Sequence, residues 1–148
     1  MILLDTNVLS EVRKRREDRA DPRVAAWMRD QSDDALFISV ICVLEVRLGV
    51  LRAEHRDLPH ATALSAWLED QVLPAFAGRI LPIGVAIARR AAELHAPRSR
   101  PHHDMLIAAT VLHHDLTLAT RNTRDFADTG VRLINPWDYR VGTGSAPE

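Results

Sequence analysis

Short apolar runs alternate along the chain with longer segments in which apolar residues recur every three or four positions. The short runs lie at 2–4, 35–39, 79–83, 116–120 and 131–136, and runs of this length predict buried strands. The longer segments between them predict amphipathic helices. Strands that alternate with helices form a parallel sheet covered on both faces, so the pattern predicts a three-layer α/β fold with a mainly parallel central sheet.

Residues that start and stop helices delimit the helical segments. The predicted helices lie directly after Asp5 and over 21–31, 40–53, 61–77, 84–96 and 102–114. Asp21 and Pro22 are a cap and a first helical residue, and Ser39 is a cap for the long helix that follows it. Pro74 is expected to end the helix in which it lies.

The composition is that of a globular protein with one core. Of the 148 residues 47% are apolar and 26% are charged, so we expect one domain over 1–140 and a flexible tail over 141–148, which is rich in small residues. The sequence has no apolar stretch long enough to span a membrane, and its start lacks the pattern of a secretory signal. This predicts a cytoplasmic protein without membrane contact.

Neither the net charge nor the cysteine content indicates a particular ligand or catalytic group. The formal net charge is −1, so contact with a polyanion would depend on a local basic patch. Only Lys14 among the 19 basic residues is a lysine, and the one dense basic run spans 13–16. Arginine suits phosphate contact, but such a run is also typical of a solvated helix end. Cys42 has apolar neighbours and is predicted to be a small buried hydrophobe.

Asp5 lies between the first apolar run and a predicted helix. This places it at the carboxyl end of a strand, where ligands bind in open α/β sheets. The alternative is that its side chain only accepts hydrogen bonds from the free N–H groups at the start of the helix. The residue by itself leaves both roles open.

Glu45 is predicted to face the apolar side of its helix. The residues one turn away are Ile41, Cys42, Leu48 and Gly49. An ionised carboxylate among such neighbours needs a cation, a proton or a metal ion. A salt bridge with one of the many arginines is therefore the alternative to a metal site.

Two further acids lie where a helix or a turn begins. Asp104 falls in the first turn of the helix after Pro101, where the helix dipole favours an acid whatever its function. Asp125 lies three residues after Asn122, so the two could form a reciprocal cap. A capping role and a functional role are open for both acids.

Considered together, the acids predict a metal site. Its expected ligands are Asp5, Glu45, Asp104 and Asp125. Carboxylates gathered in one pocket raise each other's pKa unless a cation neutralises them, and oxygen ligands select a hard cation such as Mg²⁺, with Mn²⁺ as a substitute. Such a metal polarises a phosphoryl oxygen and lowers the pKa of a bound water, so the set predicts phosphodiester hydrolysis.

Four segments resemble those of one known family. They are ILLDTNVLSE at 2–11, SVICVLEVRLG at 39–49, HHDMLIAAT at 102–110 and LTLATRNTRDFADTGVRLINPW at 116–137. In this order and at this separation they resemble PIN-domain proteins of the VapC type, the ribonuclease toxins of bacterial toxin–antitoxin pairs. The last segment is similar to the FitB-like branch. Each motif alone is weak, but four in order over nearly the whole chain are specific.

The resemblance implies a PIN-like fold and a type II toxin that is an Mg²⁺- or Mn²⁺-dependent endoribonuclease. It implies that the four acids form the metal site and that three polar neighbours orient ligands or water. These neighbours are Thr6, Thr120 and Asn122. It also implies a VapB-like antitoxin that covers the site, and a homodimer. We expect RNA to be cut by a metal-activated water, because no Ser, Cys or Lys has a nucleophile motif of its own.

Two other functions are compatible with parts of the sequence. The HHD triplets at 102–104 and 113–115 resemble metal ligands of HD-type phosphohydrolases, although that fold is all-helical and this chain has strand signals. A non-catalytic partner-binding module would have acids with structural roles only. Binding of a divalent metal by the free protein distinguishes the enzyme from such a module.

Overall fold

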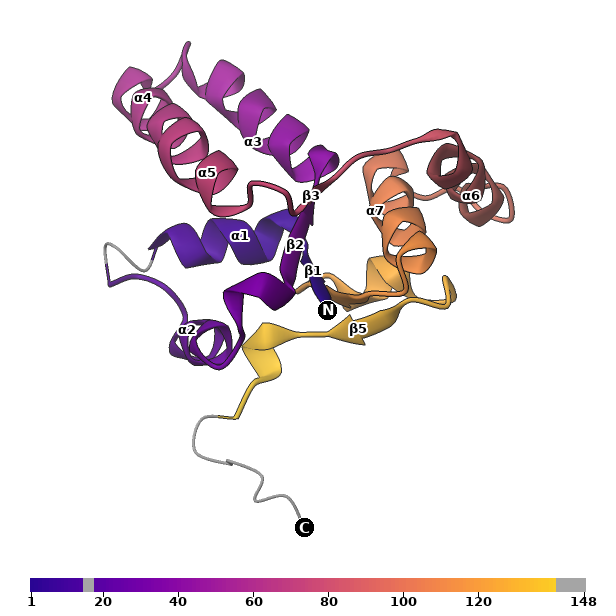
Figure 1. Cartoon of the computed structure of the whole chain (residues 1–148). Coiled ribbons are helices and arrows are strands. Elements are labelled where there is room, and N and C mark those ends of the chain that lie inside the picture. The colour runs from indigo at the N-terminus through magenta and orange to yellow at the C-terminus, as the bar shows by residue number, and fades with distance from the viewer. Residues whose placement is uncertain (15–17, 141–148) are drawn as a thin grey trace.

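The computed structural model of the chain describes residues 1–14 and 18–140. The predicted tail at 141–148 and part of the basic run at 13–16 lie outside these residues. The described part contains a sheet of five strands in the order β3-β2-β1-β4-β5, and all neighbouring strands are parallel (Figure 1). The strands are β1 (Ile2–Leu4), β2 (Leu36–Ser39), β3 (Ile80–Leu81), β4 (Thr117–Ala119) and β5 (Arg132–Ile134).

Helices lie on both sides of this sheet. They are α1 (Thr6–Arg13), α2 (Pro22–Arg29), α3 (Val40–Ala53), α4 (Leu58–Trp67), α5 (Leu73–Ala75), α6 (Val85–His95) and α7 (His102–His113). Figure 1 shows α1 to α5 on one side of the strands and the pair α6 and α7 on the other. The predicted three-layer α/β fold is confirmed. No helix in the described residues is both long and apolar enough to cross a membrane.

The strand order reverses direction at the centre of the sheet. The chain places β2 and β3 on one side of β1, and later β4 and β5 on the other side. β1 and β4 pair in parallel with Leu4 opposite Ala119. Ligands bind outside the carboxyl ends of strands at such a switch point. Asp5 and Thr120, which directly follow these two strands, therefore lie at the expected ligand-binding edge.

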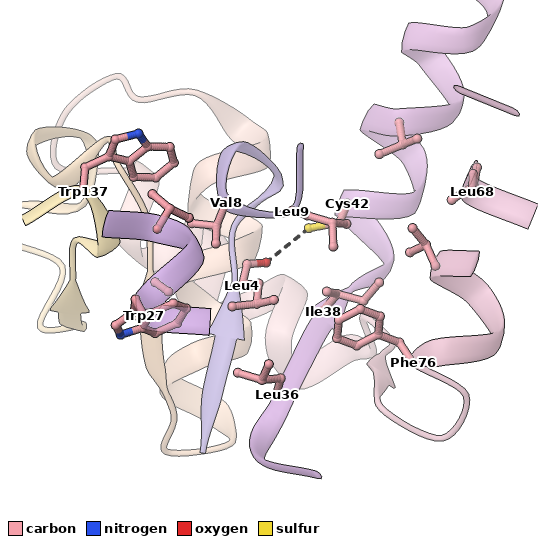
Figure 2. Packing of buried hydrophobic residues seen from close by; sticks show 14 residues of the cluster. Leu4, Val8, Leu9, Trp27, Leu36, Ile38, Cys42, Leu68, Phe76 and Trp137 are labelled. Carbon is pink, nitrogen blue, oxygen red and sulfur yellow. Dashed lines mark hydrogen bonds between the residues drawn. The ribbon is translucent and has the colours of Figure 1, made fainter. Parts of the chain in front are cut away.

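Two apolar clusters fill the spaces between the layers. In the first, Leu4 of β1 packs with Val8 of α1, Trp27 of α2 and Cys42 of α3 (Figure 2). The second cluster contains Leu3 of β1 and residues of α7. Successive side chains of a strand point to opposite faces, so one short strand supplies both clusters.

Cys42 is fully buried, as predicted. Its Sγ donates a weak hydrogen bond to the backbone oxygen of Leu4 at 3.5 Å (Figure 2) and accepts one from Thr6 Oγ1 at 3.3 Å. Burial raises the pKa of this thiol to about 12, so it is protonated at neutral pH. The thiol joins α3 to the end of β1 and is not a nucleophile.

Several element boundaries differ from the predictions by one to three residues, and two of these differences have a clear local cause. α4 begins at Leu58, before the predicted start at 61, because the Asp57 side chain caps it by accepting a hydrogen bond from His60 N at 3.1 Å. The strand predicted at 79–83 is shorter and ends at Leu81. Pro82 follows, and its missing N–H cannot continue the ladder of hydrogen bonds.

The turn that carries Asp125 is fixed by one buried ring. This turn is the 3₁₀ helix η4 (Thr123–Phe126), which follows β4. The Phe126 side chain is 1% exposed and packs in the second cluster, while Asp125 beside it is exposed. Phe126 therefore holds the turn against the sheet and leaves the acid at the surface.

We expect Phe126→Ala to lower the free energy of unfolding by about 3 to 5 kcal/mol, because it removes a buried ring and leaves a cavity. Urea unfolding followed by circular dichroism measures the change. Val85→Ala is the control, since Val85 is 71% exposed and its truncation should change stability by less than about 0.5 kcal/mol. Equal losses for the two variants would contradict the anchoring role of Phe126.

Candidate active site

Asp5 is both a helix cap and a buried carboxylate at the switch point. Its Oδ1 accepts a hydrogen bond from Thr6 N at 2.8 Å, which caps α1. Its Oδ2 accepts hydrogen bonds from Thr120 Oγ1 at 2.8 Å and from Asn7 Nδ2 at 3.3 Å. The residue is only 5% exposed. The capping role is therefore confirmed, and the ligand-binding role stays a prediction for the same side chain.

Burial is the main influence on Asp5 and raises the pKa of its carboxyl group. The hydrogen bonds from Thr120, Thr6 and Asn7 lower this pKa, in that order of size, and the charge of Asp125 raises it. The net effect is a raised pKa. A buried acid with several donors and a nearby like charge is typical of a functional site rather than of a cap alone.

Thr120 and Asn7 connect the ends of β1 and β4. Thr120 is fully buried, and its Oγ1 accepts hydrogen bonds from Asn122 N at 3.0 Å and Asn7 Nδ2 at 3.3 Å while it donates to Asp5. Asn7 Oδ1 in turn accepts from Arg121 N at 3.2 Å. The sequence predicted Thr120 as a polar neighbour, but it did not single out Asn7. The polar triplet 5–7 directly after a strand was the available signal.

Glu45 of α3 is half-buried, and burial is the largest cause of its raised pKa. The Asp5 carboxylate raises this pKa further, whereas His103 and the hydroxyl of Thr6 lower it. No ion pair in the described residues joins Glu45 to an arginine, so the salt-bridge alternative has no support there. Thr6 lies between the two acids, as expected of a polar neighbour.

Asp104 lies in the first turn of α7, where the sequence predicted it. Burial raises the pKa of its carboxyl group to about 6, and the charges of Asp5, Asp125 and Glu45 contribute to the increase. His103 lowers this pKa. The four predicted acids therefore act on one another electrostatically, although they come from four separate segments.

The reciprocal cap proposed for Asn122 and Asp125 does not form. The Asn122 side chain makes no capping hydrogen bond to η4, and the contact between the two residues is from Asp125 N to the backbone oxygen of Asn122 at 3.1 Å. Asp125 remains exposed, and its charge acts on Asp5 and Asp104. The Asn122 backbone N–H donates a hydrogen bond to Thr120, so among the described residues the hydrogen bonds of Asn122 with the site are made by its backbone.

The donor set fits a hydrated divalent cation. As they stand, no three His, Cys, Asp or Glu side chains among the described residues lie close enough together to enclose a metal ion. Mg²⁺ keeps several of its waters and needs only one or two direct carboxylates. Asp5 Oδ1 accepts a single hydrogen bond and so retains a lone pair, whereas Oδ2 accepts two. The chemistry of the set therefore suits one direct ligand with further acids reached through water.

The fold contradicts the HD-type alternative. HD phosphohydrolases are all-helical, whereas this chain has a parallel sheet. The two HHD triplets also lie at opposite ends of α7, with Asp115 paired at 3.2 Å with Arg132. His103 acts electrostatically on Glu45 and Asp104, and it lowers the pKa of both carboxyl groups.

Comparison with known proteins agrees with this geometry. A family model described as the PIN domain matches residues 2–131. The chain belongs to the PIN-domain family. The matched span includes all four acids, and the VapC-type, FitB-like resemblance of the sequence motifs is confirmed by curated relatives.

Two curated relatives of this PIN domain match along nearly their whole length. "VapC ribonuclease Y4jK" of Sinorhizobium fredii is 40% identical over 143 residues, which cover 93% of this chain and 99% of that protein. "Toxin FitB" of Neisseria gonorrhoeae is 38% identical over 146 residues, with the same two coverages.

Solved structures share the fold of this PIN domain. The structure of FitAcB from Neisseria gonorrhoeae has a TM-score of 0.82 at 38% identity and covers 93% of this chain and 99% of that chain. A toxin–antitoxin complex from Klebsiella pneumoniae has a TM-score of 0.63 at 27% identity, with coverages of 92% and 98%.

We expect Asp104→Asn to stabilise the metal-free protein at neutral pH. The folded pKa of Asp104, about 6, exceeds the ordinary value of 3.8, so the native state binds more protons than the unfolded state between these values. The free energy of unfolding therefore falls as pH rises through this window, and it stays lower above it. Asparagine removes this loss, which amounts to on the order of 1 kcal/mol after allowance for solvent screening.

Urea unfolding in EDTA at about pH 7.5 and about pH 4.5 tests this expectation, with Asp70→Asn as the control on the exposed surface of the helical segment 68–72. The gain for Asp104→Asn should be larger at the higher pH. A loss of stability at the higher pH would show that the Asp104 carboxylate is stabilised, rather than repelled, by its surroundings.

Proposed function

We propose that this PIN domain is a metal-dependent endoribonuclease and the toxin of a type II toxin–antitoxin pair of the VapBC kind. The observation that supports the proposal is that acids from four separate segments act on one another electrostatically, so that the charges of neighbouring acids help to raise the pKa of Asp5, Glu45 and Asp104. The 40% identity to a VapC ribonuclease supports RNA as the substrate and hydrolysis as the reaction. The 38% identity to toxin FitB supports the role of a toxin.

We assign Mg²⁺ to the site, with Mn²⁺ as a substitute, because all the candidate ligands are carboxylate oxygens. The residues that would hold it are Asp5, Glu45, Asp104 and Asp125. When bound, the metal would polarise a phosphoryl oxygen and lower the pKa of a coordinated water. Metal and proton would compete for Asp104, whose pKa lies near 6 in the metal-free protein.

The other polar residues of the site would act on these acids. Thr120 and Asn7 fix the orientation of the Asp5 carboxylate by donating to the same oxygen, and Thr6 lies against Glu45. Asn122 would act through its N–H, which holds Thr120. The nucleophile would be water, since the only cysteine is buried and protonated. No covalent intermediate with the protein is then expected.

A VapB-like antitoxin and a second copy of the chain are the proposed protein partners. The similarity to a toxin–antitoxin complex at 27% identity supports the antitoxin. Leu44 and Leu51 lie two turns apart on α3 and are 45% and 43% exposed, and Leu58 at the start of α4 is 62% exposed. Exposed apolar side chains of this size suit contact with another protein. The homodimer rests on the family resemblance.

We expect Asp5→Asn to keep the fold and to abolish most of the metal binding and RNA cleavage. Asparagine caps a helix about as well as aspartate, so α1 should remain stable. The substitution removes one of the negative charges on which divalent metal affinity depends. Calorimetry with Mn²⁺ and cleavage of a labelled RNA should both show losses of on the order of a hundredfold or more.

Asp70→Asn is again the matched control, because it removes an exposed acid outside the site. It should bind Mn²⁺ and cleave RNA like the unmodified chain. Induced expression of the chain should arrest growth, and Asp5→Asn should relieve the arrest. If calorimetry detects no Mg²⁺ or Mn²⁺ binding to the unmodified chain, the enzyme proposal fails and a non-catalytic binding module takes its place.

We expect the purified chain to be a dimer, with a mass twice the 16.6 kDa of one chain. Light scattering coupled to size-exclusion chromatography measures this mass. A monomer at high protein concentration would disprove the dimer and would leave the proposed chemistry of the site unaffected.

A further inference from the structure

Arg121 is an exposed cation at the rim of the acidic site. It directly follows Thr120, and its backbone N–H donates to Asn7 Oδ1 at 3.2 Å. Thr120 and Asn7 both donate to the Asp5 carboxylate. The Arg121 backbone is therefore fixed through the same hydrogen bonds that orient the central acid.

The Arg121 guanidinium rests on an aromatic ring instead of an acid. Its central carbon lies over the Trp137 ring, 5.1 Å from the ring centroid. Among the described residues, no side chain forms an ion pair with this guanidinium, and none accepts a hydrogen bond from it. A cation–π contact of this kind does not use the N–H groups as hydrogen-bond donors to an acid, so they can still bind an anion.

Trp137 is a rigid support for this contact. It lies in the 3₁₀ helix η5 (Pro136–Asp138), is 6% exposed and packs in the first apolar cluster close to Val8 (Figure 2). Its backbone N–H donates to Asn135 Oδ1 at 3.0 Å. A long side chain placed on a fixed ring loses less conformational freedom when it binds a ligand than a free side chain would.

The acidic site creates a need for such a cation. Four carboxylates repel the phosphates of a nucleic acid strand, and the formal net charge of −1 supplies no general attraction. Two other arginines are already engaged. Arg100 donates to the backbone oxygen of Ala127, and Arg98 pairs with Asp128. Arg124 in η4 is exposed and rests on no ring in the described residues.

We propose that Arg121, held on Trp137, binds a backbone phosphate of the RNA strand that enters the acidic site. The planar guanidinium offers two parallel N–H groups to a phosphate, which a lysine cannot do. The inference rests on the proposed function for the nature of the strand. In this inference, Arg121 binds the substrate and Trp137 positions Arg121.

RNA binding tests the proposal separately from cleavage. Fluorescence anisotropy with a labelled single-stranded RNA is measured in the Asp5→Asn background, in which the RNA stays intact. We expect Arg121→Ala to weaken binding on the order of tenfold. It should also reduce the slope of log K against log salt by about 0.7, the value for one phosphate contact on a single strand. Arg89→Ala removes an exposed arginine of α6, remote from the acids in the fold, and is the matched control.

Kinetics in the otherwise unmodified chain give a second readout. A contact made equally in the ground state and the transition state affects KM and leaves kcat unchanged. Arg121→Ala should therefore raise KM on the order of tenfold with kcat within about twofold. Arg121→Lys should retain the salt slope, because its charge remains, but should recover only part of the affinity.

Trp137→Phe tests the positioning role with a smaller ring that keeps the site apolar. It should raise KM less than Arg121→Ala does, and it should have no further effect when Arg121 is already alanine. Additive effects of the two substitutions would overturn the positioning role. Urea unfolding of Trp137→Phe shows whether a lost fold, rather than a misplaced guanidinium, causes any change.

The possible outcomes separate the two proposals. An unchanged salt slope together with an unchanged KM in Arg121→Ala overturns the role of Arg121. RNA binding that depends on Arg121, without cleavage by the unmodified chain, overturns the proposed nuclease and supports this inference. If the Asp5→Asn chain binds no RNA, either with Arg121 or with Arg121→Ala, the proposed role of Arg121 is overturned as well.

Discussion

A buried carboxylate at the switch point of a parallel sheet is the constraint on which the rest of the structure depends. Asp5 is 5% exposed and follows the central strand, where the chain must also begin α1. An acid in this position needs donors, and the structure supplies them from both sides: Thr6 N from the helix, and Thr120 Oγ1 from the neighbouring strand. These hydrogen bonds offset the cost of burying the Asp5 carboxylate, and they also fix its orientation. The same contacts therefore stabilise the fold and preorganise the carboxylate.

Packing of neighbouring residues holds the other acids in place, and the repulsion between their charges lowers the free energy of unfolding. Cys42 joins the helix of Glu45 to the end of β1, and Phe126 anchors the turn of Asp125. Neither residue touches a ligand in our proposal. Because burial and like charge raise the pKa of Asp104 to about 6, the metal-free site is under electrostatic strain that a divalent cation would relieve. The repulsion that lowers the stability of the metal-free protein would therefore also favour the binding of a cation.

The arrangement also explains how an acidic site could accept a polyanion. Metal charge would offset the carboxylates at the centre, while Arg121 lies at the rim on a ring that belongs to the core. Its backbone N–H donates to Asn7, whereas its guanidinium forms no ion pair with an acid of the described residues. In the described part of the chain, the Arg121 charge is therefore not neutralised by an acid and could bind a phosphate, as we propose.

The sequence predicted the strands, most helix starts and the four candidate acids, because these depend on local periodicity, caps and ordered motifs. The predictions missed the end of β3, which Pro82 sets, and the start of α4, which the Asp57 cap sets. The tertiary structure added that the carboxylate that caps α1 also accepts hydrogen bonds from Asn7 and Thr120, and that Asn7 in turn accepts one from the Arg121 backbone. Those facts arise from contacts between residues more than a hundred positions apart, such as that of Asn7 with Arg121, and no local pattern records such contacts.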